Sequence, residues 1–334
     1  MSRTSTLSKR LQPMLATLTD EPFDDPAWVF EDKYDGFRMI AEIRRGKVAL
    51  YSRNGKIISH SYNEIAKALE GVTGDAIIDG ELVALGKDGI SHFQLLQNAL
   101  RHGAKLLYCA FDLMFENGVD LREQPLFERK KRLSVILPRD KLIAFSAHRI
   151  ANGKEFFSEA ERKGLEGIMA KRADSAYASG VRSPDWLKVK TAKRQEVVIA
   201  GFTAPRRTRP FFGSLVLAVR DETSWRYIGH VGTGFTHKAL ADLHAKLVKL
   251  KTPKSPFPAN VKNESATTWV KPTLVAEVKF AEWTSTGELR QPVYLGLRTD
   301  KAAKDVVREK VKPRRSAPLS ASADKRCRKP THKP

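Results

Sequence analysis

A short segment near the start of the chain, residues 31–38 (EDKYDGFR), places a lysine between acidic residues and close to a glycine and an arginine. The amine of a lysine is a nucleophile only when it has lost its proton, and its ordinary pKa of about 10.4 makes that state rare at neutral pH. Burial and neighbouring cations lower such a pKa, and Arg38, Lys188 and Lys190 could supply those cations. The segment is therefore compatible with a lysine that acts in covalent catalysis, although alone it is more simply interpreted as a charged hairpin.

Further short motifs place charged or aromatic residues at the ends of apolar runs. In chain order they are SRNG (52–55), DGEL (79–82), FDL (111–113), EGIMAK (166–171), WLKVK (186–190) and RTDK (298–301). Because side chains alternate across a strand, Lys188 and Lys190 are expected on one face. Each motif alone has an ordinary structural explanation, such as a capped turn, a surface ion pair or a core aromatic ring.

The order and spacing of these motifs resemble those of the covalent nucleotidyltransferase superfamily, which contains the ATP-dependent polynucleotide ligases and the mRNA-capping guanylyltransferases. The resemblance covers residues 31–301. Within the superfamily the sequences of the motifs are most similar to those of the ligase module of bacterial ligase D and its stand-alone relatives in non-homologous end joining. The segments PMLAT (13–17), EDKYDGFR and YLGLRTDK (294–301) carry this similarity.

The resemblance implies a role for each matching residue on the nucleoside side of the site. Lys33 matches the lysine that attacks the α-phosphate of ATP, expels pyrophosphate and becomes lysyl-AMP. Glu31 matches a contact to the adenine edge, and Phe111 matches the ring that stacks on adenine. Arg38 and Glu81 match residues that hold the ribose.

Other matching residues are implied to handle phosphates and metal. Lys188 and Lys190 match lysines that grip the α-phosphate, and Arg53 matches a contact to nucleotide or nick phosphate. Arg298 and Lys301 match a barrel motif that closes over the pocket and orients the pyrophosphate. Glu166, with Glu81 as a second candidate, matches a metal-associated carboxylate.

The implied cofactors are ATP and Mg²⁺, with Mn²⁺ as the alternative metal, since a hard cation held by few carboxylates and a triphosphate suits Mg²⁺. The implied reaction continues with transfer of AMP to a 5′-phosphate in duplex DNA. The 3′-hydroxyl then displaces AMP and seals the strand.

Two alternatives remain open at this stage. One is an RNA ligase or a capping-type guanylyltransferase of the same superfamily, because motifs alone do not distinguish ATP from GTP. The other is a non-catalytic nucleic-acid-binding protein, which would require the order of the motifs to be accidental and Lys33 to be dispensable.

The elements expected around the motifs give an α+β, two-domain fold. We expect an antiparallel-sheet nucleotidyltransferase (adenylation) domain over 1–193, an OB-fold barrel over 194–305 and a disordered basic tail over 306–334. In the first domain β-branched and aromatic runs predict strands within 28–36, 39–53, 74–85 and 106–115, and apolar spacing predicts helices within 62–71, 126–137 and 154–164. In the second, five strands within 196–203, 213–220, 225–232, 273–284 and 292–298 and one helix at 237–250 suit a small Greek-key barrel.

Composition indicates the class of partner. The 334 residues carry a net charge of +21, of which residues 311–334 hold +7, so the remainder is basic as well. Such a charge attracts nucleic acid, and we expect nicked or broken duplex DNA as partner, with a Ku-like end-binding protein as a further candidate. The arginines in 206–209 are candidates for contacts to DNA phosphates. Two cysteines and no apolar run of 18 residues predict a cytoplasmic protein without a membrane span. We also expect a monomer that is associated with the bacterial nucleoid.

Overall fold

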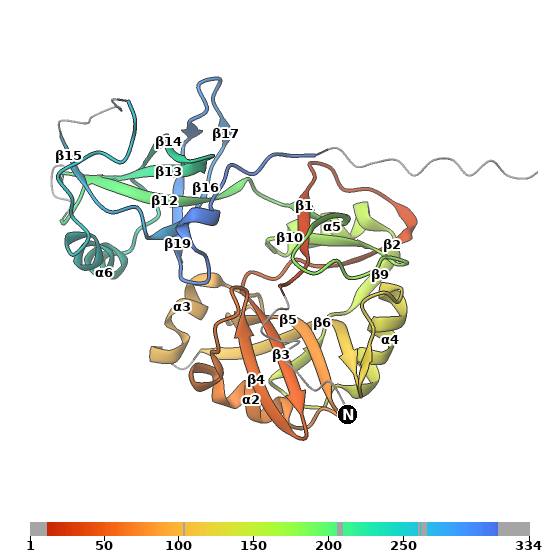
Figure 1. The fold of residues 1–334 in the computed structure, drawn as a ribbon. Coiled ribbons are helices and arrows are strands. Elements are labelled where there is room, and N and C mark those ends of the chain that lie inside the picture. Colours follow the sequence, from red (N-terminus) through yellow and green to blue (C-terminus); the bar gives the residue numbers. More distant parts are fainter. Residues whose placement is uncertain (1–11, 103, 206–209, 260, 262–265, 313–334) are drawn as a thin grey trace, which may run out of the picture.

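The computed structural model describes residues 12–312 apart from 103, 206–209, 260 and 262–265. Two sheets and a barrel make up this part of the chain (Figure 1). Residues 313–334, most of the predicted tail, and the arginines at 206–209 lie outside the described residues. No helix in the described part has the length and apolar character needed to cross a membrane.

The first sheet has the strand order β4-β3-β5-β6-β7, with β8 paired to β6. Its strands are β3 (Phe37–Arg44), β4 (Lys47–Ser52), β5 (Ala76–Leu85), β6 (Lys105–Glu116), β7 (Val119–Asp120) and β8 (Ile143–Phe145). Arg45 and Gly46, both with positive φ, form the two-residue turn between β3 and β4. This is the turn geometry that matches strand twist in a hairpin.

Helices cover one face of the first sheet. They are η1 (Ser59–Tyr62), α2 (Asn63–Leu69), α3 (Phe93–His102) and α4 (Leu126–Ile136). Because side chains alternate along β3, Met39, Ala41 and Ile43 enter the core under these helices, whereas Ile40 enters another core on the opposite face. That second core contains Phe111 of β6. The opposite face of the sheet is therefore free to meet the second sheet.

The second sheet has the order β1-β11-β10-β2-β9 and carries one helix. Its elements are β1 (Leu15–Leu18), β2 (Asp25–Asp32), β9 (His148–Ala151), α5 (Gly153–Arg162), β10 (Gly167–Arg172) and β11 (Arg182–Lys190). Trp28 and Phe30 of β2 pack with Ala160 of α5, so the alternate residue Glu31 is turned the other way. Residues 1–27, for which no strand was predicted, contain β1, which pairs in parallel with β11.

The barrel sheet runs in the order β14-β13-β12-β16-β19, with β15 paired to β12. Its elements are β12 (Arg194–Thr203), β13 (Leu215–Asp221), β14 (Ser224–Val231), α6 (His237–Val248), β15 (Thr267–Trp269), β16 (Val275–Lys279) and β19 (Val293–Arg298). A β-bridge between Thr233, which follows β14, and Val293 of β19 connects the two outermost strands of this sheet. The strand predicted over 273–284 is divided in two, because after β16 the chain leaves β12 and forms β17 (Glu282–Trp283), which pairs with β18 (Leu289–Arg290).

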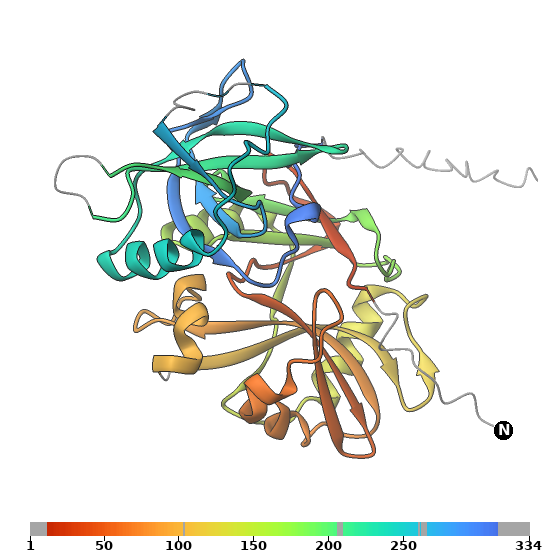
Figure 2. The same cartoon turned by 60° about the vertical axis from the view of Figure 1, so that its left-hand side comes forward.

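The barrel meets the first sheet through β19 and α3, which lie side by side in both views (Figures 1 and 2). There the Gln94 side chain of α3 donates to the Leu295 carbonyl of β19. Helix α3 was not predicted, although the apolar residues Phe93, Leu96 and Ala99 recur at helical spacing. This contact places the end of β19 above the first sheet.

The chain after β19 differs from the predicted disordered tail over its first residues. Following η3 (Ala303–Asp305), residues 306–312 run between the barrel and the second sheet (Figure 1). The Arg220 amide donates to the Val306 carbonyl at 2.6 Å, and the Lys312 amide donates to the Leu18 carbonyl at 3.0 Å. Val306 is 1% exposed. Backbone pairing and burial of one apolar side chain therefore hold this segment in place.

Candidate active site

A cavity of about 200 Å³ lies where the two sheets and the barrel meet. All the site residues predicted from sequence line it: Glu31, Lys33, Arg38, Arg53, Glu81, Phe111, Glu166, Lys188, Lys190, Arg298 and Lys301. The strand ends of both sheets contribute most of them, and β19 and the loop after it contribute the last two. Motifs spread over most of the chain thus surround one space.

Lys33 follows β2 directly and faces a carboxylate. Its amide donates to the Gly167 carbonyl at 3.0 Å, and its ammonium group forms an ion pair with Glu166. Gly167 has φ of +149°, and a Cβ there would collide with the Val189 carbonyl of β11. Burial raises the pKa of Glu166, but the charges of Lys33, Arg194 and Lys190 have the larger, opposite effect. The pKa of Glu166 therefore lies below its usual value. The lysine and an ionised carboxylate are thus held in contact.

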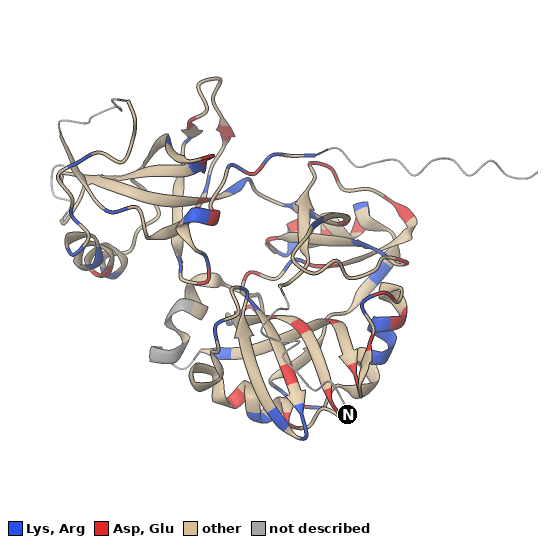
Figure 3. Ribbon diagram, in the orientation of Figure 1, with Lys and Arg blue, Asp and Glu red and all other residues tan. Residues whose placement is uncertain are grey.

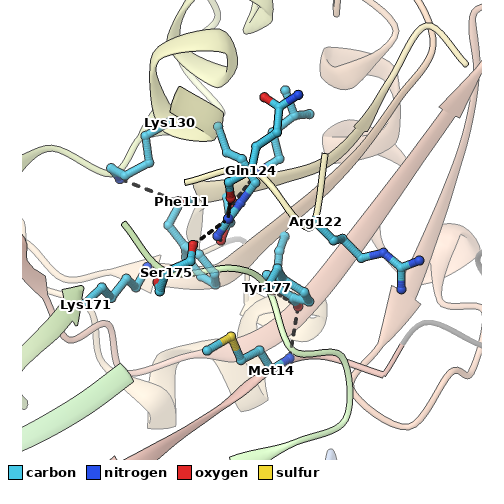
Figure 4. Close-up of polar contacts among 12 residues, drawn as sticks. Met14, Phe111, Arg122, Gln124, Lys130, Lys171, Ser175 and Tyr177 are labelled. Carbon is cyan, nitrogen blue, oxygen red and sulfur yellow. Dashed lines mark hydrogen bonds and ion pairs between the residues drawn. The ribbon is translucent and has the colours of Figure 1, made fainter. Parts of the chain in front are cut away.

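Glu31 lies in a buried network of two lysines. Its carboxylate accepts from Lys130 of α4 at 2.8 Å, from Lys171 of β10 at 2.9 Å and from the Ser146 hydroxyl at 3.0 Å. Burial raises the pKa of Glu31, but the two lysines outweigh it and lower that pKa to about 2. Figure 4 shows Lys130 also reaching the backbone carbonyl of Phe111. Glu31 is therefore an ionised acceptor of fixed position.

The Phe111 ring is bordered by cations and by a second aromatic ring. The Lys171 nitrogen lies 4.2 Å from the ring centre, and the Arg38 guanidinium carbon lies 4.5 Å from it. Trp186 meets Phe111 edge-on at 6.1 Å. The sequence motifs EGIMAK and WLKVK contain Lys171 and Trp186, but neither residue was predicted to belong to the site. Burial is the main reason why the pKa of Lys171 falls to about 8.

Arg38 is fixed by a partner that the motifs did not assign to it. Two guanidinium nitrogens donate to the Asp79 carboxylate, each at 2.5 Å, and the Tyr177 hydroxyl donates to the same carboxylate at 2.5 Å. Figure 4 shows Tyr177 accepting from the Met14 amide as well, at 3.0 Å. A contact of Arg38 to the ribose, as predicted, would have to use guanidinium N–H groups that do not bond to Asp79.

The two acids of the DGEL motif have separate surroundings. Asp79 is fully buried in the pair with Arg38, whereas Glu81 lines the cavity. Within the described residues the Glu81 carboxylate has no basic nitrogen within ion-pair distance. Burial raises its pKa to about 7, although the charges of Arg38, Lys33 and Arg298 act in the opposite direction. A Cβ at Gly80, between them, would collide with the Tyr108 ring.

The barrel residues close the cavity from above. Arg298 donates twice to Asp300, at 2.9 and 2.8 Å, and its guanidinium lies 4.3 Å from the ring centre of Phe93 in α3. Lys301 donates to Glu196 of β12 at 2.7 Å. The end of β19 is therefore held over the first sheet by a cation–π contact that crosses between the domains.

Lys188 and Lys190 share one partner. Both ammonium groups contact the Glu309 carboxylate, at 2.5 and 2.9 Å, as their common face on β11 allows. Burial and the charge of Lys190 lower the pKa of Lys188 to about 8, against the effect of Glu309. Glu309 belongs to the segment that was predicted to be a disordered tail, so no motif pointed to it.

Packing within the first sheet requires a glycine at position 36. A Cβ at this position would collide with the Leu82 carbonyl of β5. The motif EDKYDGFR by itself offers no such reason for a glycine.

Two family models match this chain. The ATP dependent DNA ligase domain matches residues 13–190, and the ATP dependent DNA ligase C terminal region matches residues 208–301. The chain belongs to the ATP-dependent DNA ligase family. The predicted α+β fold, with an adenylation domain followed by an OB-type domain, is thereby confirmed. The capping-type guanylyltransferase and the non-catalytic binding protein are not favoured, because the matching models are those of DNA ligases.

Curated relatives of the ligase are longer than this chain. The multifunctional non-homologous end joining protein LigD of Pseudomonas aeruginosa is 38% identical over 312 residues, which is 90% of this chain and 37% of that protein. The multifunctional non-homologous end joining DNA repair protein LigD of Mycobacterium tuberculosis H37Rv is 36% identical over 304 residues, 90% of this chain and 40% of that protein. The chain thus spans about two fifths of their length.

Solved structures cover the same region. A mycobacterial DNA ligase D complexed with ATP and MES is 34% identical, with a TM-score of 0.69 over 91% of this chain and all of that chain. The ligase domain of M. tuberculosis LigD is also 34% identical, with a TM-score of 0.51 over 90% of this chain and 99% of that chain. The first of these contains the nucleotide expected from the motifs.

Charges around the cavity of the ligase are close to balanced. Nine basic and ten acidic side chains line it, and Figure 3 shows both kinds on the elements that surround it. Most of the acids form ion pairs with a lysine or arginine of the same lining. A triphosphate that enters must therefore replace carboxylates as the partner of these cations.

The donor set fits a magnesium ion carried with a nucleotide. Within the described part of the chain, no group of three or more His, Cys, Asp or Glu is placed to bind a metal. Mg²⁺ is usually held by one or two carboxylates together with substrate phosphates. Glu81, which has no ion-pair partner there, and Glu166 on the same cavity are a donor set of that kind. A metal at this position remains a prediction.

Proposed function

We propose that this ligase forms lysyl-AMP on Lys33, transfers the AMP to a 5′-phosphate at a nick or break in duplex DNA, and seals the strand. The observation that carries the proposal is the position of Lys33 in a cavity that also contains Arg298 and Lys301 of the barrel. The barrel motif lies some 265 residues from Lys33 in sequence and yet borders the same space. A lone charged hairpin would have no such surroundings.

In the first step the Lys33 nitrogen, once it has lost its proton, attacks the α-phosphorus of ATP. A nitrogen–phosphorus bond forms, and the bond from phosphorus to the bridging oxygen breaks, so that pyrophosphate leaves. The ion pair with Glu166 holds the lysine nitrogen at the cavity before the reaction. Transfer of this kind depends on positioning and on neutralising the charge of the phosphate oxygens.

The cations of the lining supply that neutralisation. We assign Lys188 and Lys190 to the α-phosphate, Arg298 and Lys301 to the departing pyrophosphate, and Arg53 to a nucleotide or nick phosphate. Mg²⁺, or Mn²⁺ in its place, would be held by Glu81 and Glu166 and would neutralise further phosphate charge when bound. These roles rest on the shared cavity and on the resemblance of the motifs.

On the nucleoside side, Phe111 provides a flat face for adenine, and Glu31 provides an ionised acceptor for its amino group. Arg38 and Glu81 are assigned to the ribose. The fixed position of Glu31 supports this assignment, because a carboxylate held by two lysines keeps its geometry when the base arrives.

In the later steps the AMP passes from Lys33 to the 5′-phosphate of the DNA. The 3′-hydroxyl then attacks that phosphate and AMP leaves. The net charge of +21 supports DNA as the partner. Names of the LigD relatives support a role in end joining. A Ku-like protein as partner and a nucleoid-associated monomer as the acting form are further parts of the proposal. The limits 1–193 and 194–305 for the two domains belong to the same proposal.

The test is covalent labelling with α-labelled nucleotide. Wild-type ligase with ATP and Mg²⁺ should give a labelled adduct, whereas Lys33→Ala should give none because the nucleophile is gone. Label retained by Lys33→Ala would refute the assignment of Lys33. Parallel reactions with GTP and NAD, followed by sealing of nicked DNA and nicked RNA, test the choice of nucleotide and substrate.

A further inference from the structure

Glu309 occupies an unusual position for a residue beyond the last barrel strand. Its carboxylate joins Lys188 and Lys190, the two lysines of β11 that face the cavity, with one oxygen on each ammonium group at 2.5 and 2.9 Å. Both lysines are at most 15% exposed. A single anion bridging two cations is also how a phosphate would be bound at this place.

The segment that carries Glu309 is held next to this residue by side chains of the barrel. The Gln195 side chain of β12 donates to the Val307 carbonyl at 3.0 Å and accepts from the Glu309 amide at 3.0 Å. The Arg308 guanidinium lies 4.2 Å from the ring centre of Trp283. Together with the backbone bonds from Arg220 to Val306 and from Lys312 to Leu18, these contacts keep Glu309 in register with the lysines.

When no phosphate is bound, the charges of Lys188 and Lys190 favour another anion beside them. Two neighbouring buried ammonium groups repel each other, and burial itself disfavours their charged forms. Glu309 is kept ionised by its partners: burial raises its pKa, but Lys190 and Lys188 outweigh that effect and lower it. Conversely, a phosphate placed on the same lysines would repel the Glu309 carboxylate. Glu309 and a nucleotide phosphate therefore compete for one site.

We propose that Glu309 is a positioning residue that holds Lys188 and Lys190 in the nucleotide-free ligase at the place of a nucleotide phosphate, and that ATP displaces it together with residues 306–312. The inference rests on the proposed function, because it takes these lysines as phosphate ligands. It adds that ATP must displace the Glu309 carboxylate before it can bind these lysines, which lowers the apparent affinity for ATP. Occupation of the cavity is thereby coupled to release of the segment that leads in sequence to Arg314 and Arg315.

The kinetic test uses Glu309→Gln, which removes the charge and keeps the shape. Because the competing anion is lost, we expect the KM for ATP in Lys33 adenylylation to fall about tenfold, with kcat changed less than twofold. Glu309→Asp keeps the charge and should stay within about threefold of the wild-type KM. Glu282→Gln is the matched control, because Glu282 pairs with Arg290 on an exposed hairpin. A KM for Glu309→Gln that is unchanged or raised would overturn the proposal.

A second measurement needs no variant. Hydrogen exchange of the peptide 306–312 should become at least tenfold faster when wild-type ligase is saturated with α,β-methylene-ATP, because the amides of Glu309 and Lys312 lose their acceptors. Unchanged or slower exchange would overturn the inference even if Glu309→Gln does not fold. If the wild type forms the Lys33 adduct and the peptide stays protected, only this inference fails. If no adduct forms at all, the proposed function itself fails.

Discussion

Two sets of ion pairs at the cavity hold their charged groups in different ways: the Glu31 network, and the pairs of Lys188 and Lys301 with their glutamates. On the nucleoside side, Glu31 and Lys130 are 2% and 1% exposed, and both belong to the first domain. On the phosphate side, Lys188 and Glu309 are 15% and 22% exposed, and the pair joins β11 to the segment beyond the barrel. Lys301 and Glu196 are similarly accessible, at 13% and 20%.

This difference separates a permanent framework from a set of exchangeable partners. Fully buried ion pairs within one domain have no competing solvent and no reason to open, so they fix the geometry of the base pocket. Pairs that are partly exposed can exchange a carboxylate for a phosphate at lower cost, because water assists the exchange. An ion pair alone therefore does not show that its residues have only a structural role.

The largest expected effect is on the phosphate side of the cavity. Arg298→Ala should lower the rate of Lys33 adenylylation about 100- to 1,000-fold, the usual loss for one charge-stabilising donor. Sealing of a nick that already carries AMP should lose less than about tenfold, because no pyrophosphate leaves in that step. Rapid-quench assays of both steps measure the ratio. Arg290→Ala on the exposed hairpin is the control, and equal losses in the two steps would contradict a leaving-group role for Arg298.

The next effect concerns the framework. Lys130→Met should lower the free energy of unfolding by about 3 kcal/mol, because it leaves Glu31 buried with one cation fewer. Urea unfolding followed by circular dichroism measures it. The neighbouring Lys131 is exposed, so Lys131→Met should change stability by less than about 0.5 kcal/mol. Similar losses in the two variants would show that the buried network is not the rigid framework inferred above.

The smallest effect lies at Glu81, between the two sides. Because burial raises its folded pKa to about 7 from 4.5, the protonated carboxyl favours the folded state. That contribution is complete below pH 4.5 and is lost as the pH rises through 7. Between pH 5 and 8, without nucleotide, the wild type should therefore lose about 2 kcal/mol more stability than Glu81→Gln. Parallel pH dependence of the two proteins in urea unfolding would refute the raised pKa.

Local patterns along the chain determine much of this fold. Strands β3, β5 and β6 and helices α2, α4 and α5 lie where alternation and helical spacing predicted them, because those signals arise from neighbours along the chain. Other features, such as helix α3, strand β1 and the break after β16, were not predicted. Strand β1 depends on its parallel partner β11, more than 160 residues away, and the break after β16 depends on β18 taking over as partner.

The site shows the same division. The pleat of β11 by itself directs Lys188 and Lys190 to one face, and the motif order indicated which residues share a cavity. The partners of those residues were set by packing between distant segments. Lys130 reaches Glu31 across 99 residues, and Glu309 reaches Lys188 across 121.

Sequence alone thus determined the chemical groups that this ligase presents, since residue type and short-range periodicity are properties of the chain itself. Tertiary structure decided which carboxylate each cation meets. Those pairings depend on how two sheets, a barrel and a returning terminal segment pack together, and no local spacing encodes that packing. Asp79 beside Arg38 and Glu309 beside the β11 lysines are the clearest examples, because either acid could equally have faced solvent.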